Sequence, residues 1–374
     1  MNEKTKNLVI VVITAVIVFG LSIWCFAKPA DEMSLSERRQ LKQLPELSVD
    51  TLLGLNGKTT FMDGFEKYAA DQFPMRESFR AINSVTSLYM LGKNEINNLF
   101  TTGGYIAKLE HEIHQDSVDW SLNRLDFIRQ TYLAGKDNVY LAIIPDKNYY
   151  IAQQSGYPYI DFEKFSQLFK DGTGSFAKYI DLTGQLSLSN YYFTDTHWKQ
   201  ETLIPTAKYI SEAMGNSYNF TFTENALDTE FEGVYYGQLA VPLEKDKIKY
   251  LTGSYIDSLS VKCFDTGKGV DIGVYNNEKI DGDDKYEYFL SGSKALITIE
   301  NPNAATDKEL VIFRDSFTSS MAPLLAGNYK KTTLVDIRYM NPGMLKMFVK
   351  FDNADVLFLY SAQVLNNSVG QFIN

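Results

Sequence analysis

Leu310-Val-Ile-Phe-Arg-Asp-Ser-Phe-Thr-Ser-Ser-Met-Ala-Pro-Leu-Leu325 carries the clearest structural signal in the sequence, and the rest of the prediction starts from it. Its first four residues are apolar, which is typical of a buried strand, and Phe317, Met321 and Leu324 follow at helical spacing. Ser316 lies at the turn between the predicted strand and the predicted helix, where the first helix amides have no partner within the helix. Such amides stabilise developing negative charge, so Ser316 is a candidate nucleophile, although a serine here also suits the plainer role of a helix cap.

A candidate base for this serine lies upstream, in the stretch Tyr191-Tyr-Phe-Thr-Asp-Thr-His-Trp198. The chain has 3 histidines, and His197 is the only one outside residues 110–116. Asp195 stands two residues before it, so both side chains can act from one loop. By itself, a single histidine among aromatic residues is more often a core residue. Because a serine nucleophile needs a base and the base needs an orienting carboxylate, Asp195, His197 and Ser316 together predict a catalytic triad.

The two motifs resemble those of a known family. Thr194-Asp-Thr-His-Trp198 and Phe313-Arg-Asp-Ser-Phe317 are similar to the motifs of the DHHW branch of the SGNH (GDSL-like) hydrolases, which is related to the membrane-anchored alginate O-acetylation proteins. In those relatives the Asp-x-His motif precedes the serine motif, as it does here. The pattern is broken at Thr196, where the family name has its first histidine, and at Arg314, where Gly-Asp-Ser has glycine. Residues 65–76 also resemble the N-terminal region of this family.

Other apolar runs predict the rest of the sheet, and they lie at residues 138–147, 333–337 and 354–360. Helix-length intervals separate these runs, as a parallel sheet with crossover helices requires. The sequence therefore predicts an α/β fold. The resemblance implies, more specifically, an SGNH-hydrolase-like parallel sheet flanked by helices.

Three regions are expected along the exported part of the chain. Residues 30–130 are predicted to form a stalk and an N-terminal helical region, with helical spacing in the segment 61–76. Residues 131–374 are predicted to form the catalytic domain. Within it, residues 220–300 combine many Tyr, Gly and Asp residues with short alternating runs, which predicts an irregular β-rich insertion.

Residues 8–27 form an unbroken apolar run without charges, about the 20 residues that a helix needs to cross a bilayer. Lys4 and Lys6 precede the run, which favours an N-terminus in the cytoplasm. A cleaved signal peptide is the alternative, but the run is long for one and a poor cleavage site follows it. We expect residues 1–29 to form a cytoplasmic tip and a single-pass transmembrane anchor, with the catalytic domain on the extracytoplasmic side.

Composition excludes several other classes of function. The formal net charge of −10 argues against a nucleic-acid partner. Of the two cysteines, Cys25 lies in the apolar run and Cys263 far from it, so no disulfide is expected within the exported part. His111 and His114 are three residues apart, whereas the zinc-binding pattern His-Glu-x-x-His places its histidines four apart. We expect neither a metal nor a cofactor.

Three further residues are candidates for substrate binding or an auxiliary role. Arg314 precedes the Asp-Ser pair, Tyr192 belongs to the stretch that carries the candidate base, and Lys147 follows a predicted strand. Strand ends line the sites of open α/β sheets. The plainer readings are a structural ion pair for Arg314 and a turn for Lys147. In SGNH enzymes a glycine and an asparagine complete the oxyanion hole, and the motifs place neither of them in this sequence.

The resemblance implies acyl transfer in two displacements, in which Ser316 attacks an acyl ester, His197 takes its proton and Asp195 fixes the imidazole. Its implied function is the transfer of acetyl groups to an exported polysaccharide, with a multi-span membrane acyltransferase as a partner. If water takes the acyl group instead, the protein is a carbohydrate O-acetylesterase. A third reading is a non-catalytic polysaccharide-binding or assembly scaffold, against which the complete set of triad residues argues.

Overall fold

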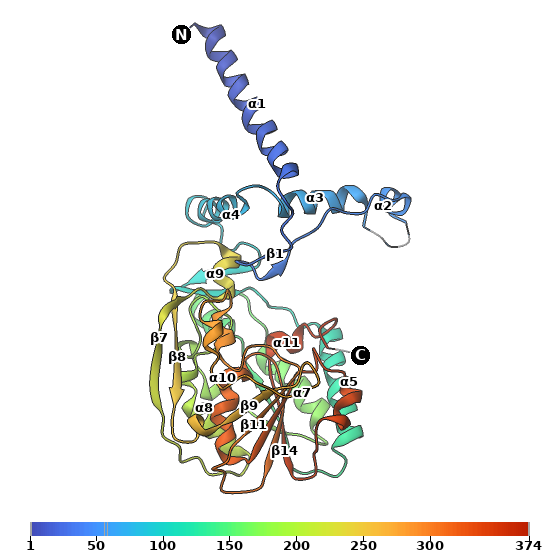
Figure 1. The fold of residues 1–374 in the computed structure, drawn as a ribbon, viewed down its shortest axis with the longest axis vertical. Coiled ribbons are helices and arrows are strands. Elements are labelled where there is room, and N and C mark those ends of the chain that lie inside the picture. Colours follow the sequence, from blue (N-terminus) through green and yellow to red (C-terminus); the bar gives the residue numbers. More distant parts are fainter. Residues whose placement is uncertain (1, 56, 58, 373–374) are drawn as a thin grey trace. The chain divides into compact units, whose positions relative to one another are not determined.

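The computed structural model describes residues 2–55, 57 and 59–372, and the chain forms two compact units (Figure 1). Unit 1 comprises Met1–Asn97 and Tyr236–Pro242, and unit 2 comprises Asn98–Tyr235 and Leu243–Asn374. The second unit begins earlier than the predicted boundary at residue 131. The reason is the helix α5 (Gln115–Tyr132), which buries one apolar face in the core of unit 2.

Unit 2 is built on one eight-stranded sheet with the strand order β10-β9-β11-β13-β12-β14-β5-β6. The neighbours from β13 to β6 all pair in parallel, whereas β11 pairs antiparallel with both β13 and β9. The α/β fold predicted from the sequence is therefore confirmed. The strands are β5 (Val139–Ile144), β6 (Lys178–Ile180), β9 (Ser260–Cys263), β10 (Val270–Asp271), β11 (Leu296–Glu300), β12 (Glu309–Arg314), β13 (Lys331–Val335) and β14 (Ala354–Ser361).

Both faces of this sheet are buried, which explains why its central strands read as continuous apolar runs. Alternate residues of a strand point to opposite faces. In β12, Leu310 and Ile312 pack in the core cluster that contains residues of α8 (Ile204–Ala213) and α10 (Thr318–Leu325). Val311 and Phe313 pack in the other cluster, together with α5 and α7 (Phe162–Thr173). The helices therefore cover the sheet on both sides.

The predicted β-rich insertion at 220–300 is only partly separate from the sheet. Its strands β7 (Thr223–Phe231) and β8 (Asp246–Thr252) form a hairpin of their own. By contrast, β9 and β11 pair with each other and extend the main sheet beyond β13. The remaining elements of unit 2 are β3 (Leu99–Thr102), β4 (Tyr105–Lys108), α6 (Lys147–Ser155), α11 (Ala362–Asn366) and the short helical turns η2 (Thr183–Gln185), η3 (Leu188–Asn190), η4 (Gln200–Thr202), η5 (Ile256–Ser258), η6 (Asn277–Lys279), η7 (Lys285–Tyr288), η8 (Ala326–Asn328) and η9 (Pro342–Met347).

Unit 1 begins with the long helix α1 (Glu3–Ala27). Among the described residues, this is the one helix that is long and apolar enough to cross a membrane, a test that a signal sequence near the N-terminus also passes. Short elements follow it. They are β1 (Met33–Ser34), β2 (Arg39–Gln40), α2 (Val49–Leu53), α3 (Phe61–Asp71), α4 (Arg76–Val85), the π-helical turn η1 (Thr86–Met90) and α9 (Val234–Leu239), which runs into unit 1 from unit 2.

Candidate active site

Ser316 lies at the C-terminal end of the sheet, in the turn between β12 and α10. Asp315 holds this turn, because one carboxylate oxygen accepts from the Phe317 amide (3.1 Å) and the other from the Ser361 amide (2.7 Å) at the end of β14. The neighbours of Ser316 in the chain are buried, whereas Ser316 itself is partly exposed. The turn therefore presents this hydroxyl group to solvent from an otherwise closed interior.

The structure brings Ser316, His197 and Asp195 together. The His197 Nε2 atom lies 2.8 Å from the Ser316 Oγ atom, and its Nδ1 atom lies 2.5 Å from Asp195 Oδ1. Asp195 is fully buried and also accepts from the amides of His197 (2.9 Å) and Val234 (2.8 Å). A buried carboxylate against Nδ1 favours the tautomer with its proton there, which leaves Nε2 free to accept the serine proton.

The tryptophan that ends the Asp-x-His motif joins the two motifs physically. The Trp198 indole N–H donates to the Phe317 carbonyl (2.8 Å) and the Ser320 hydroxyl (2.9 Å), both of which follow Ser316. Trp198 is completely buried, so neither bond competes with water. The loop that carries His197 is thereby fixed against the helix that follows the serine.

Two residues of the hairpin region that sequence reasoning missed also shape this loop. Asp246 accepts from the amides of Phe193 (2.9 Å) and Thr194 (2.7 Å). At Gly233, a Cβ atom would lie 2.3 Å from the Thr194 carbonyl oxygen and 2.4 Å from the Asp195 Cα atom, so no side chain fits there. Gly233 could have been noticed in the sequence, because it is the one glycine within residues 231–236. Asp246 lies in a segment without a clear pattern, so nothing in the sequence pointed to it.

Lys147, the first residue of α6, is fully buried beneath the same loop. Its ammonium group donates to the carbonyls of Tyr192 (3.0 Å), Phe193 (3.2 Å) and Asp195 (2.6 Å). Burial lowers the pKa of Lys147 to about 8, against the opposing effect of the nearby carboxylates, of which Asp195 is the first. The position of Lys147 therefore suits holding the loop that carries the candidate base.

Lys147→Met is expected to lower the free energy of unfolding by about 2 kcal/mol at pH 7, because buried carbonyls lose their donor. The difference should depend on pH. The pKa is about 8 in the folded chain and higher in the unfolded one, so the unfolded chain binds more protons above pH 8. Stability of the wild type should therefore rise relative to the variant from pH 8 to about 10. Urea unfolding of both proteins from pH 8 to about 10 measures the difference between their unfolding free energies. A difference that stays constant over this range would contradict the prediction.

The other two auxiliary candidates are buried as well. Arg314 donates to the Ser319 hydroxyl (2.8 Å) and to three backbone carbonyls, and its pKa is lowered by burial. Tyr192 packs edge-on against Phe231, with ring centroids 5.1 Å apart. Arg314, Tyr192 and Lys147, the three residues proposed for substrate binding or an auxiliary role, are thus all fully buried in this structure. Their polar groups are directed into the interior, and no part of these side chains reaches the surface.

Tyr286, in η7, is a further residue of the site that the motifs did not indicate. Its ring stacks on the His197 imidazole, with centroids 3.8 Å apart and planes 8° from parallel. Its hydroxyl lies 2.9 Å from the Ser320 Oγ atom. Burial raises the pKa of Tyr286, so the phenol remains neutral. The imidazole is therefore fixed through its ring face as well as through both nitrogen atoms.

The amides that follow Ser316 are already engaged, contrary to what the strand–turn–helix pattern suggested. The Phe317 amide donates to the Asp315 carboxylate, the Thr318 amide to the Asp315 carbonyl (3.2 Å), and the Ser319 amide to the Ser316 carbonyl (3.0 Å). These amides tighten the turn. The strand–turn–helix pattern takes no account of the residue before the serine. Here that residue is Asp315, which accepts from amides that the pattern leaves without a partner.

No protein-family model matches the chain, and no curated protein sequence matches it. Solved structures do match it. The structure of Bacillus cereus PatB1 has a TM-score of 0.57 at 18% identity and covers 71% of this chain and 96% of that chain. A DHHW family protein from Eubacterium siraeum has a TM-score of 0.53 at 17% identity, over 72% of this chain and 93% of that one. The O-acetyltransferase domain of Pseudomonas putida AlgJ is more distant, with a TM-score of 0.43 at 11% identity over 72% and 92%.

At these identities the likeness to PatB1 and to the Eubacterium siraeum protein concerns the fold. Nearly the whole of each of those two chains is matched, so the shared part is a complete fold and not a single motif. The resemblance that the Asp-x-His and serine motifs carried is thus confirmed at the level of the fold. The chain has the fold of PatB1 and of a DHHW family protein.

Proposed function

We propose that this protein is an extracytoplasmic O-acyltransferase, in which Ser316, His197 and Asp195 move acetyl groups onto an exported polysaccharide. The observation that carries the proposal is the continuous line from the Ser316 hydroxyl through the imidazole to a buried carboxylate, with 2.8 Å and 2.5 Å between the groups. Only the serine end of that line is open to solvent. A base oriented by a buried carboxylate is what activation of a serine hydroxyl requires.

The reaction would proceed in two displacements. Ser316 Oγ attacks the carbonyl carbon of an acetyl ester while His197 Nε2 takes the hydroxyl proton, and the tetrahedral intermediate then expels the donor alcohol, which receives that proton. In the second displacement a sugar hydroxyl attacks the acetyl-serine, His197 takes its proton and returns it to Ser316. The imidazolium formed in each step would be stabilised by the Asp195 carboxylate at its Nδ1–H.

Two lines support acetyl transfer to a polysaccharide as the specific chemistry. The first is the resemblance of both motifs to the DHHW branch and its alginate-acetylating relatives. The second is the fold shared with PatB1, whose structure has also been solved with a sulfonyl adduct. A sulfonyl fluoride is accordingly a suitable probe for a nucleophile here. If it modifies Ser316, the intact mass of the protein increases by one sulfonyl group.

The membrane helix fits this function. We propose that α1 is retained as an anchor with its N-terminus in the cytoplasm, which leaves the candidate site on the side where polysaccharides are exported. A multi-span membrane acyltransferase that supplies the acetyl group is the proposed partner. Its gene would be expected beside the gene of this protein.

Because water can also reach a partly exposed serine, the test must separate transfer from hydrolysis. The full chain in detergent is incubated with p-nitrophenyl acetate, with and without candidate oligosaccharides, and both free acetate and acetylated sugar are measured. Acetylated sugar, with release of p-nitrophenol accelerated by the sugar, supports the transferase. Acetate alone, whatever the sugar, would establish the esterase. No turnover and no sulfonyl or acetyl adduct would leave the non-catalytic scaffold as the better reading.

Tyr286→Leu is expected to lower kcat/KM for the acetyl ester about fivefold, because a stacked aromatic ring contributes about 1 kcal/mol to holding its partner. Tyr286→Phe is the matched control. It keeps the ring on the His197 imidazole and loses only the hydroxyl contacts with Ser320 and with the Phe317 carbonyl, so a change within about threefold is expected. Equal losses in the two variants would show that the hydroxyl contact and not the stacking matters.

A further inference from the structure

Unit 1 exposes far more apolar side chains than unit 2 does. Among the described residues outside α1, fifteen large apolar side chains of unit 1 are exposed, against nine in unit 2, although unit 2 is more than twice as long as unit 1. Short helices such as α3 and α4 depend on packing for their stability. Exposed apolar residues gathered in one region usually mark a surface that something else covers.

Helix α4 and the turn η1 that continues it expose large apolar side chains and bury polar ones. An outer stripe of Met75, Phe79, Ile82, Tyr89 and Met90 follows helical spacing, and all five side chains are exposed, from 45% at Phe79 to 77% at Met90. The inner face, which carries Arg76, Arg80, Ser84 and Ser87, is polar and turned toward the protein, while the polar residues Glu77, Ser78 and Asn83 are exposed beside the stripe. In a helix that faces water, the apolar stripe packs on the core and the polar face is exposed.

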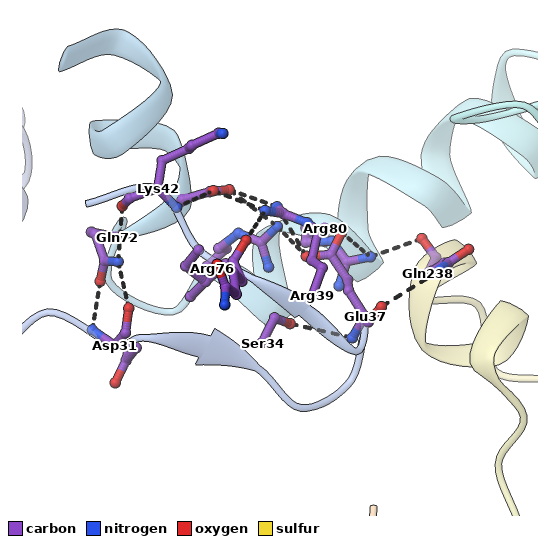
Figure 2. Close-up of polar contacts among 12 residues, drawn as sticks. Asp31, Ser34, Glu37, Arg39, Lys42, Gln72, Arg76, Arg80 and Gln238 are labelled. Atoms are coloured by element: carbon purple, nitrogen blue, oxygen red, sulfur yellow. Dashed lines mark hydrogen bonds and ion pairs between the residues drawn. The ribbon is translucent and has the colours of Figure 1, made fainter. Parts of the chain in front are cut away.

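Figure 2 shows what the inner face contacts. Arg76 and Arg80 both pair with Glu37, and their side chains are only 14% and 15% exposed. Arg80 also donates to the carbonyls of Gly237 (2.9 Å) and Gln238 (2.8 Å). Farther along the same face, Ser84 and Ser87 are buried, each 4% exposed. These bonds fix the rotation of the helix, so the outer stripe cannot turn inward without breaking them.

The helix starts beside the end of the membrane helix. Gln72 caps α3 four residues before α4 begins. The Cys25 thiol donates to the Gln72 carbonyl (3.8 Å), and Lys28 Nζ lies 3.5 Å from the side-chain oxygen of Gln72. At 1.5 Å per residue the apolar run 8–27 is about 30 Å long, the thickness of the hydrocarbon core of a bilayer. A spanning α1 therefore reaches the headgroup level where α4 starts.

We propose that the outer stripe of α4 and η1 inserts into the lipid bilayer at its headgroup boundary, beside the point where α1 leaves the membrane. The proposal rests on the proposed anchoring role of α1. A lipid surface is favoured over a protein partner because the stripe begins beside the C-terminal end of α1, the proposed anchor. Trp24 at the end of α1 and Tyr89 in the stripe are also residue types that concentrate at membrane–water interfaces. An amphipathic helix of this kind lies in the plane of the interface.

A lipid quenching experiment tests this on the full chain in phosphatidylcholine vesicles. A single cysteine replaces Met90, 77% exposed, and in a second protein it replaces Met347 of unit 2, a matched methionine that is 72% exposed. Ile82→Cys provides a second site in the stripe. Each carries an environment-sensitive nitrobenzoxadiazole label, and vesicles with and without doxyl-labelled lipid are compared. Both native cysteines are buried, and labelling of the unsubstituted protein gives the background.

The expected result is a blue-shifted emission and about a twofold loss of fluorescence with doxyl lipid for labels at residues 82 and 90, and no loss at residue 347. Two outcomes overturn the proposal. If the labels at residues 82 and 90 emit and resist quenching as the label at residue 347 does, the stripe faces water. If their emission is blue-shifted but doxyl lipid does not quench it, the stripe is covered by protein, such as a second copy of this chain. Failure of the anchor is distinguishable, because the protein would then not float with the vesicles at all.

Discussion

Ser316→Ala is expected to lower the turnover of p-nitrophenyl acetate by at least about three orders of magnitude. The variant removes the only atom of the proposed triad that forms a bond to the substrate, and alanine offers no group that could replace it. The hydroxyl that lies 2.8 Å from the His197 Nε2 atom is lost, while the Asp195–His197 contact remains intact. The acetyl and sulfonyl adducts should both be absent from the intact mass.

The matched control for this variant is Ser189→Ala, which removes an exposed hydroxyl group of the same unit. Its turnover should equal that of the wild type. Circular dichroism and urea unfolding of both variants show whether loss of activity reflects loss of the fold. Ser316 is partly exposed and its hydroxyl bonds to the His197 Nε2 atom, so loss of this one bond should leave the unfolding of both variants close to that of the wild type. Turnover by Ser316→Ala within about tenfold of the wild type would mean that another group is the nucleophile.

Much of the sheet could be predicted from the sequence because buried parallel strands carry a direct signal. The runs that became β5, β12 and β14 are apolar on both faces, and helix-length intervals separate them. The hairpin region was harder. Its short alternating runs do not reveal whether a strand pairs locally, as β7 does with β8, or joins a distant sheet, as β9 does. That choice depends on partners far apart in the sequence.

The candidate site also has residues that the sequence predicts and residues that it does not. The identities of Ser316, His197 and Asp195 could be proposed from residue chemistry, since the chain has only 3 histidines and His197 is the one in an Asp-x-His motif. The residues that hold these three side chains in place could not be predicted in this way. Tyr286 stacks on the imidazole from an irregular segment 89 positions along the chain, and no local pattern predicts such a contact. Lys147 was predicted near a site, but its role depends on carbonyls that only the folded loop brings together.

The inner and outer faces of α4 were missed for a different reason. Its sequence has the helical spacing of any amphipathic helix, and the usual inference places the apolar stripe against the protein core. Here the polar face is the buried one, because its arginines pair with Glu37 and with carbonyls of residues 237 and 238. Periodicity identifies two faces of a helix. It does not determine which of them faces the protein.

Asp195→Asn is expected to lower kcat/KM by about three to four orders of magnitude, although it changes a single atom. The carboxylate accepts from three donors at once, the His197 ring at 2.5 Å, the His197 amide at 2.9 Å and the Val234 amide at 2.8 Å. An asparagine has one acceptor oxygen and one NH₂ group, so at least one N–H donor would face another donor. If the NH₂ group faces the imidazole, it favours the tautomer with the proton on Nε2, which can no longer accept the proton of Ser316.

The same change should cost about 1–3 kcal/mol of unfolding free energy, because a buried amide loses its acceptor. Activity must therefore be measured where both proteins are fully folded, as judged by urea titration. Asp228→Asn, at an exposed position of β7, is the control for charge and should leave kcat/KM unchanged. A folded Asp195→Asn protein within about tenfold of the wild type would show that the carboxylate does not set the tautomer. The base would then have to be oriented by Tyr286 and the buried loop alone.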